Sequence, residues 1–179
     1  MDLALWDYAA LILAGIVAGF INVMAGGGSI ITVPVMMFLG VPGPVANGTN
    51  RLPIVAQNIS ACLTYLRHGV PEPALILSLA LCAVPGAIAG ALLGVTIAGE
   101  AFNIVLAVVM ALVLIAILTN ARSPEDNVTF KPSRSRLLAG HGLMVIAGFW
   151  GGFIQIGMGF ILLPILHRVL GLSLVTANI

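Results

Sequence analysis

The sequence predicts an all-α membrane protein, a polytopic helical bundle with inverted repeats that each open with a glycine-broken, re-entrant helix. Three observations support this fold class. The 179 residues are 60% hydrophobic and 7% charged, whereas soluble domains carry about 25% charged residues. Long apolar stretches separate the few charged residues, and an apolar segment interrupted by glycines occurs twice. This much apolar surface requires lipid as the solvent for a large part of the chain.

Four uncharged stretches mark the candidate spans. They run for 43 residues after Asp7, 27 after Glu72, 21 after Glu100 and 31 after Arg136. A helix needs roughly 20 apolar residues to cross the hydrocarbon core, so each stretch holds at least one span. The alternation typical of strands is absent from the sequence, so the predicted spans are helices.

The first repeat covers residues 1–119 and opens with an apolar segment over 8–39. Three consecutive glycines interrupt this segment and cost about 3 kcal/mol of helix propensity relative to alanine. We therefore expect two half-helices, Tyr8–Met24 and Ile30–Leu39, on either side of the break. Three spans complete the repeat in the prediction, over 45–66, 74–97 and 101–119.

The second repeat starts after a polar connection over 120–135 and is incomplete within residues 136–179. The Gly15-x-x-x-Gly19-Phe20-Ile21-Asn22 motif returns 133 positions later as Gly148-x-x-x-Gly152-Phe153-Ile154-Gln155. Beyond the breaks the spacing is 131, which pairs Gly40 with Gly171 and Asn47 with Asn178. We expect a C-terminally truncated copy of a natural chain of about 250–260 residues with three further spans.

Basic residues predict the orientation. Arg67 and His68 follow the second span, and the 120–135 connection is also basic, so the positive-inside rule places both in the cytoplasm. The acidic N-terminal flank is expected outside. An odd number of crossings then separates the N-terminus from Arg67, so the first broken segment must enter and leave on one side. The predicted location is the inner (plasma) membrane, crossed several times.

The first break is a candidate anion site. Half-helix N-termini carry positive partial charge and bind anions. Gly26, Gly27 and Gly28 lack side chains, so an anion could approach the backbone amides closely. Ser29 is expected to cap the second half-helix. The alternative explanation is close helix packing without a ligand.

A polar cluster opens the second predicted span. Arg51 is expected about six residues into this helix, where a charge costs at least about 2.5 kcal/mol near the membrane centre and by default suggests function. Asn47, Thr49 and Asn50 can orient an oxyanion by hydrogen bonds while Arg51 supplies charge. The alternative is that Arg51 snorkels to the interface.

Asn22 and Gln155 occupy equivalent places just before the two breaks. Each amide could cap exposed carbonyl groups or contact substrate, and the sequence leaves both alternatives open. Gly86-x-x-x-Gly90-x-x-x-Gly94 is interpreted as a packing stripe between helices.

Several function classes lack support in the sequence. The three histidines show no metal-ligand spacing, and Cys62 and Cys82 lie in apolar segments typical of core cysteines. The chain shows no Ser–His–Asp arrangement or HExxH motif, so we expect no enzyme. A basic patch with interleaved aromatic residues is also missing, so nucleic acid is not an expected partner. No cofactor or metal is predicted.

Five motifs are distinctive: Ala18-Gly19-Phe20-Ile21-Asn22, Ala25-Gly26-Gly27-Gly28-Ser29, Ala46-Asn47-Gly48-Thr49-Asn50-Arg51, Gly151-Gly152-Phe153-Ile154-Gln155-Ile156-Gly157-Met158-Gly159 and Ala177-Asn178. With these motifs in this order, the chain resembles the sulfite exporter TauE/SafE family. The resemblance implies a plasma-membrane transporter of small anions such as sulfite, sulfonates or related sulfur-containing organic anions. The positions that match the family motifs are Asn22, Gly26, Gly27, Gly28, Ser29, Asn47, Asn50, Arg51, Gln155, Gly157, Gly159 and Asn178.

The expected partners are a small anionic substrate and the lipid bilayer, and the sequence leaves the oligomeric state open. The alternative function is a non-transporting membrane subunit or receptor that uses the same site to sense an anion.

Overall fold

The computed structural model describes residues 4–97, 99–119 and 133–179. Within these residues the chain is helical and contains no strand, which confirms the predicted all-α class. The helices are α1 (Leu5–Ala25), α2 (Ser29–Phe38), α3 (Gly43–Thr49), α4 (Arg51–His68), α5 (Pro73–Thr96), α6 (Glu100–Thr119), α7 (Arg134–Phe153), α8 (Met158–Pro164), a π-helical turn (Ile165–Val169) and α9 (Leu174–Asn178). Most of the predicted 120–135 connection lies outside the described residues.

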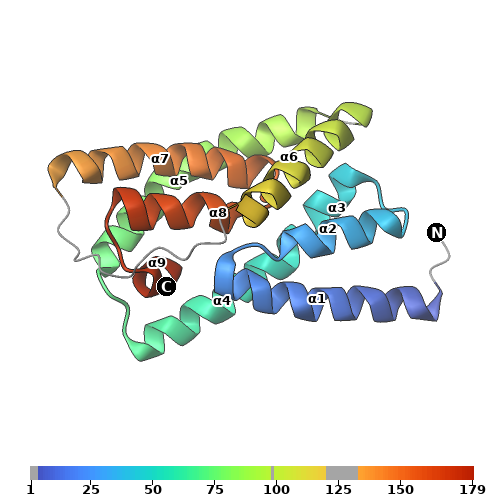
Figure 1. Ribbon diagram of the computed structural model, residues 1–179, viewed down its shortest axis with the longest axis horizontal. Helices are drawn as coiled ribbons and strands as arrows, with labels where there is room; N and C mark the ends of the chain where they lie inside the picture. The colour runs from blue at the N-terminus through green and yellow to red at the C-terminus, as the bar shows by residue number, and fades with distance from the viewer. Residues whose placement is uncertain (1–3, 98, 120–132) are drawn as a thin grey trace.

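The first glycine run divides α1 from α2. Gly26 has a φ of +64°, a left-handed conformation that glycine adopts without steric cost and that ends α1. The chain then reverses, and α2 runs back along α1 (Figure 1). The broken segment is therefore a helical hairpin. The ends of its two helices differ from the predicted ends by one to three residues.

The predicted span over 45–66 is divided into two helices in the structure. α3 ends at Thr49 and α4 begins at Arg51, with Asn50 between them. Pro53 explains the division, because proline has no N–H to donate to the carbonyl group of Thr49 four residues earlier. Arg51 is consequently the first residue of α4, and not a residue inside a continuous helix as we expected.

Helices α5 and α7 lie side by side and run in the same direction (Figure 1). A Cβ atom at Gly86 or Gly90 would collide with the backbone of α7, and one at Gly148 or Gly152 would collide with the backbone of α5. The two backbones approach this closely because glycines face each other from both helices. The predicted packing stripe is confirmed, and its partner is the corresponding stripe of α7.

The order of elements recurs along the chain. In the first half (residues 4–119), α1 leads through a break to α2, and a left-handed glycine, Gly40, precedes α3. In the second half (residues 133–179), α7 leads through a break to α8, and Gly171 precedes α9 with a φ of +74° against +86° at Gly40. The two glycines are the pair that the sequence repeat aligned.

In the part of the chain that the structure describes, two helices are long and apolar enough to cross a membrane, Leu5–Met24 and Pro73–Thr96. Shorter apolar helices cover Ser29–Phe38, Glu100–Ile115 and Met158–Val169. Large apolar side chains also cover the outside, as on α1, where Ile16 and Phe20 are 65% and 69% exposed. Such a surface suits lipid as its solvent.

The start of α1 lies at one end of the molecule, whereas the α4–α5 turn and the start of α7 lie at the other (Figure 1). This is the arrangement that the predicted orientation requires. The orientation in the membrane stays a prediction.

Candidate functional site

A cavity of about 510 Å³ lies where the two helix breaks meet. Its lining comes from both breaks, from α1, α2, α4, α5, α8 and α9, and from the π-helical turn. Among the described residues that line it there is no Asp, Glu, Lys, Arg or His. In the described part of the chain, no group of three or more His, Cys, Asp or Glu residues could hold a metal ion.

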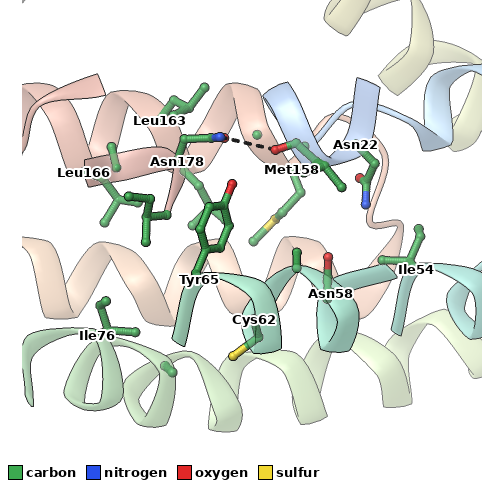
Figure 2. Close-up of a pocket in the computed structure, with 18 of the residues that line it drawn as sticks. Asn22, Ile54, Asn58, Cys62, Tyr65, Ile76, Met158, Leu163, Leu166 and Asn178 are labelled. Carbon is green, nitrogen blue, oxygen red and sulfur yellow. Dashed lines mark hydrogen bonds between the residues drawn. The ribbon is translucent and has the colours of Figure 1, made fainter. Parts of the chain in front are cut away.

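Polar and apolar side chains both line the cavity. Asn58 and Tyr65 point from α4 toward the segment that carries Asn178, and Asn22 lies beside the first break (Figure 2). The other polar lining residues are Ser29, Cys62 and Gln155. The apolar lining includes Ile54, Leu66, Ile76, Leu77, Leu162, Leu163 and Leu166.

The two breaks contact each other directly. The backbone N–H of Gly159 donates a hydrogen bond to the carbonyl oxygen of Gly26 over 3.1 Å. A Cβ atom on Gly26 would lie 2.8 Å from the Cα atom of Gly159, so this approach requires glycine. The glycines of both halves therefore allow two helix breaks that are far apart in sequence to contact each other.

The two equivalent amides, Asn22 and Gln155, both line the cavity. Asn22 donates from Nδ2 to Oε1 of Gln57 over 3.1 Å, which fixes its side chain. Gln155 has a φ of +65°, which is uncommon for a residue with a side chain and costs of order 1–3 kcal/mol. Such backbone strain is concentrated at functional sites, so it supports a functional role for Gln155.

Ser29 has a different role from the expected one. The N-cap of α2 is Gly28, and Ser29 is the first residue of the helix. Its Oγ accepts a hydrogen bond of 3.0 Å from Nδ2 of Asn50, and Oδ1 of Asn50 accepts one of 2.6 Å from Oγ1 of Thr32. Asn50 thus ties α2 to the α3–α4 junction because both ends of its amide are engaged.

Arg51 lies against the end of α7. Its Nη2 atom donates to the carbonyl oxygens of Gly152 and Phe153, the latter at 3.2 Å. Nδ2 of Asn47 donates to the same Phe153 oxygen at 3.2 Å. A cation at a helix C-terminus is stabilised by the partial negative charge there. Arg51 does not line the cavity, although it lies one turn before Ile54, which does.

The structure divides the predicted binding residues into two groups. Those that line the cavity are Asn22, Gly26, Ser29, Gln155, Gly159 and Asn178. Those that do not line it are Gly27, Gly28, Asn47, Thr49, Asn50, Arg51 and Gly157. The second group includes the residues that hold the helix ends, as described for Asn47, Asn50 and Arg51.

Two lining residues were missed by the sequence reasoning. Asn58, Cys62 and Tyr65 follow each other at spacings of four and three on α4 and so share one helix face. Of the neighbouring polar residues Gln57, Asn58 and Ser60, only Asn58 lines the cavity. A search of the helical spacing would have found Cys62 and Tyr65.

Comparison with known proteins identifies the family. The sequence profile of the family described as "Sulfite exporter TauE/SafE" matches residues 11–179. A probable membrane transporter protein of Haemophilus influenzae is 32% identical over 175 residues, covering 97% of this chain and 68% of that protein. The probable membrane transporter protein ORF9 of a Sinorhizobium species is 40% identical over 116 residues, 65% of this chain and 43% of that protein.

The relative YunE of Bacillus subtilis, also named a probable membrane transporter protein, is 25% identical over 88% of this chain and 66% of its own length. The chain thus spans between about two fifths and two thirds of these relatives. No solved structure matches it. Since the family profile covers nearly all of the residues, the chain belongs to the sulfite exporter TauE/SafE family of membrane transporters.

Proposed function

We propose that this protein carries a small anion across the inner membrane through the cavity between its two helix breaks. The observation that supports this most is the lining: side chains and backbone of both breaks meet in one cavity, which contains no acidic residue among the described residues. Broken helices expose backbone polar groups, and such groups are tolerated in membranes where protein or a water-filled cavity covers them. Substrate sites of secondary transporters are typically built from such segments.

The lining offers neutral hydrogen-bond donors for an oxyanion. Asn58 and Gln155 carry amide N–H groups, and Ser29 and Tyr65 carry hydroxyl groups. The N–H groups of Ile30, Ile31 and Thr32 donate to the carbonyl oxygens of Gly27 and Gly28, so the N-terminus of α2 contributes through its positive partial charge. These features favour an anion over a cation.

Arg51 contributes charge from outside the lining in this proposal. It belongs to the same helix as Asn58 and lies one turn before Ile54, so its positive charge adds to the potential in the part of the cavity beside the breaks. Asn47, Asn50 and Arg51 then affect anion binding indirectly, because they hold the helix ends that form the cavity. We propose sulfite or a small sulfonate as the substrate, with export as the direction, in keeping with the family.

The two halves are proposed to form inverted repeats that alternate access to the cavity. The recurring order of a long helix, a break, a short helix, a glycine turn and another short helix supports the repeat. Transporters with inverted repeats move one repeat against the other around a fixed site. The whole protein would then cross the membrane several times.

Flux measurements test the proposal. The full-length protein is reconstituted in liposomes, and uptake of labelled sulfite and of a labelled short alkanesulfonate is compared with that of empty liposomes. We expect saturable uptake, which Gln155→Ala weakens and Thr96→Ala does not, because Thr96 does not line the cavity and its hydroxyl donates to the carbonyl oxygen of Leu93 in the same helix. Binding without flux would favour the receptor alternative, and absence of both would overturn the proposal.

A further inference from the structure

Two asparagines at equivalent positions each donate a hydrogen bond to the end of the broken helix of the opposite half. Nδ2 of Asn47, in α3, donates to the carbonyl oxygen of Phe153 at the end of α7 over 3.2 Å. Nδ2 of Asn178, in α9, donates to the carbonyl oxygen of Val23 near the end of α1 over 3.3 Å (Figure 2). The donors are 131 positions apart, as the repeat aligns them, whereas the acceptors are 130 apart, three positions fewer than the spacing of 133 before the breaks. Each half therefore supplies an amide to the broken helix of the other half.

The acceptors explain why these bonds matter. The last four carbonyl groups of a helix have no partner within it, and both acceptors are in the last turn of their helices. In a membrane protein no bulk water satisfies such groups at depth, so another part of the protein must do so. An amide from the opposite half meets this need at α1 and at α7. Phe153 receives a second donor of the first half, Nη2 of Arg51.

We propose that Asn47 and Asn178 are reciprocal positioning residues: each caps the broken helix of the opposite half, and together they keep both breaks in the arrangement that forms the cavity. The link to transport rests on the proposed function, whereas the caps themselves do not. Each cap is a hydrogen bond between the two halves. A movement of one half must therefore either break this hydrogen bond or move the capped helix end of the other half with it. Opening of the cavity thereby depends on both caps.

The positions of the two asparagines separate this role from direct substrate binding. Asn178 lines the cavity and is exposed, whereas Asn47 is buried and does not line it. Direct contact with substrate could explain an effect of Asn178 but not an equal effect of Asn47. Capping predicts matched effects of both, each appearing in the opposite half.

Hydrogen–deuterium exchange tests the caps without reference to transport. Asn47→Ala and Asn178→Ala are prepared in the full chain in lipid nanodiscs. Loss of one such hydrogen bond corresponds to up to about tenfold more frequent opening. We expect Asn47→Ala to accelerate exchange by up to about tenfold in residues 154–160, and Asn178→Ala to do so in residues 24–30. Thr96→Ala, a polar-to-alanine change on an exposed part of α5, serves as the control and should alter neither segment.

Exchange that rises only in the segment beside the substituted residue would overturn the proposal, as would unchanged exchange in both variants. If an alanine variant fails to insert, Asn47→Gln and Asn178→Gln take its place. They keep an amide donor at a displaced position, so the same reciprocal pattern should appear with a smaller increase.

Transport kinetics add a second readout. Both alanine variants should lower the maximal rate at least several-fold while KM changes less than twofold, because positioning residues do not contact the substrate. A rise in KM for Asn178→Ala alone would indicate direct binding and contradict the shared role. If the protein moves no anion at all, the proposed function fails, and the exchange pattern still decides whether the caps exist.

Discussion

Replacing Arg51 with alanine removes the cation that holds the C-terminal end of α7. Its Nη2 atom contacts the carbonyl oxygens of Gly152 and Phe153. In the variant, Phe153 keeps its hydrogen bond from Asn47, so the loss concentrates on Gly152. A hydrogen bond to a charged group contributes about 1.5–3 kcal/mol, and 1.4 kcal/mol is tenfold in an equilibrium. The arrangement that forms the cavity should therefore become roughly 10- to 150-fold less favoured.

Anion flux into liposomes measures this effect, after correction for the amount of inserted protein. We expect Arg51→Ala to lower flux more than tenfold while membrane insertion persists. Arg51→Lys should recover part of the flux, because lysine keeps the charge but not the planar fork of the guanidinium group. Wild-type flux in the alanine variant would refute this reasoning and would leave Arg51 as a residue that merely reaches toward the interface.

Three further predictions concern orientation and packing. Cysteines introduced at Leu5 and Ser135, in a chain without its native cysteines, should be labelled from opposite sides of the membrane; labelling of both from the cytoplasm would contradict the re-entrant hairpin. Gly26→Ala should lower the free energy of unfolding by at least about 1 kcal/mol and reduce flux, because Gly26 has a left-handed φ and lies against the backbone of Gly159. Gly142→Ala is the control and should be tolerated, since its Cβ atom would have no neighbour within 4 Å. Gly90→Leu should separate α5 from α7 and lower the melting temperature by several degrees, and an unchanged melting temperature would contradict the close packing.

The helix breaks could be predicted because their cause is local. Three consecutive glycines lower helix propensity wherever they occur, and Gly40 and Gly171 indicate turns by their own backbone freedom. The repeat then aligned the two halves. The division of α3 from α4 was also local, and the effect of Pro53 on the preceding turn was the missed signal.

The partners of the polar side chains could not be predicted in the same way. Arg51 and Gly152 are 101 positions apart, and one sequence does not show which distant carbonyl group a guanidinium meets. The positive charge of Arg51 among asparagine amides suggested an anion as its partner, yet in the structure its partners are backbone carbonyl oxygens. The cavity instead takes its polar lining from positions such as Asn22 and Gln155, for which both alternatives had stayed open.

The packing of α5 on α7 has a consequence for biogenesis. α5 belongs to the first half and α7 opens the second, yet their glycines allow the closest backbone approach between helices described above. During synthesis, α5 leaves the translocon before α7 exists, so its glycine groove must first be filled by lipid chains or by another helix. Assembly is complete only when α7 displaces that temporary neighbour. The two halves are consequently interlocked, and neither would reach its native packing as a separately expressed unit.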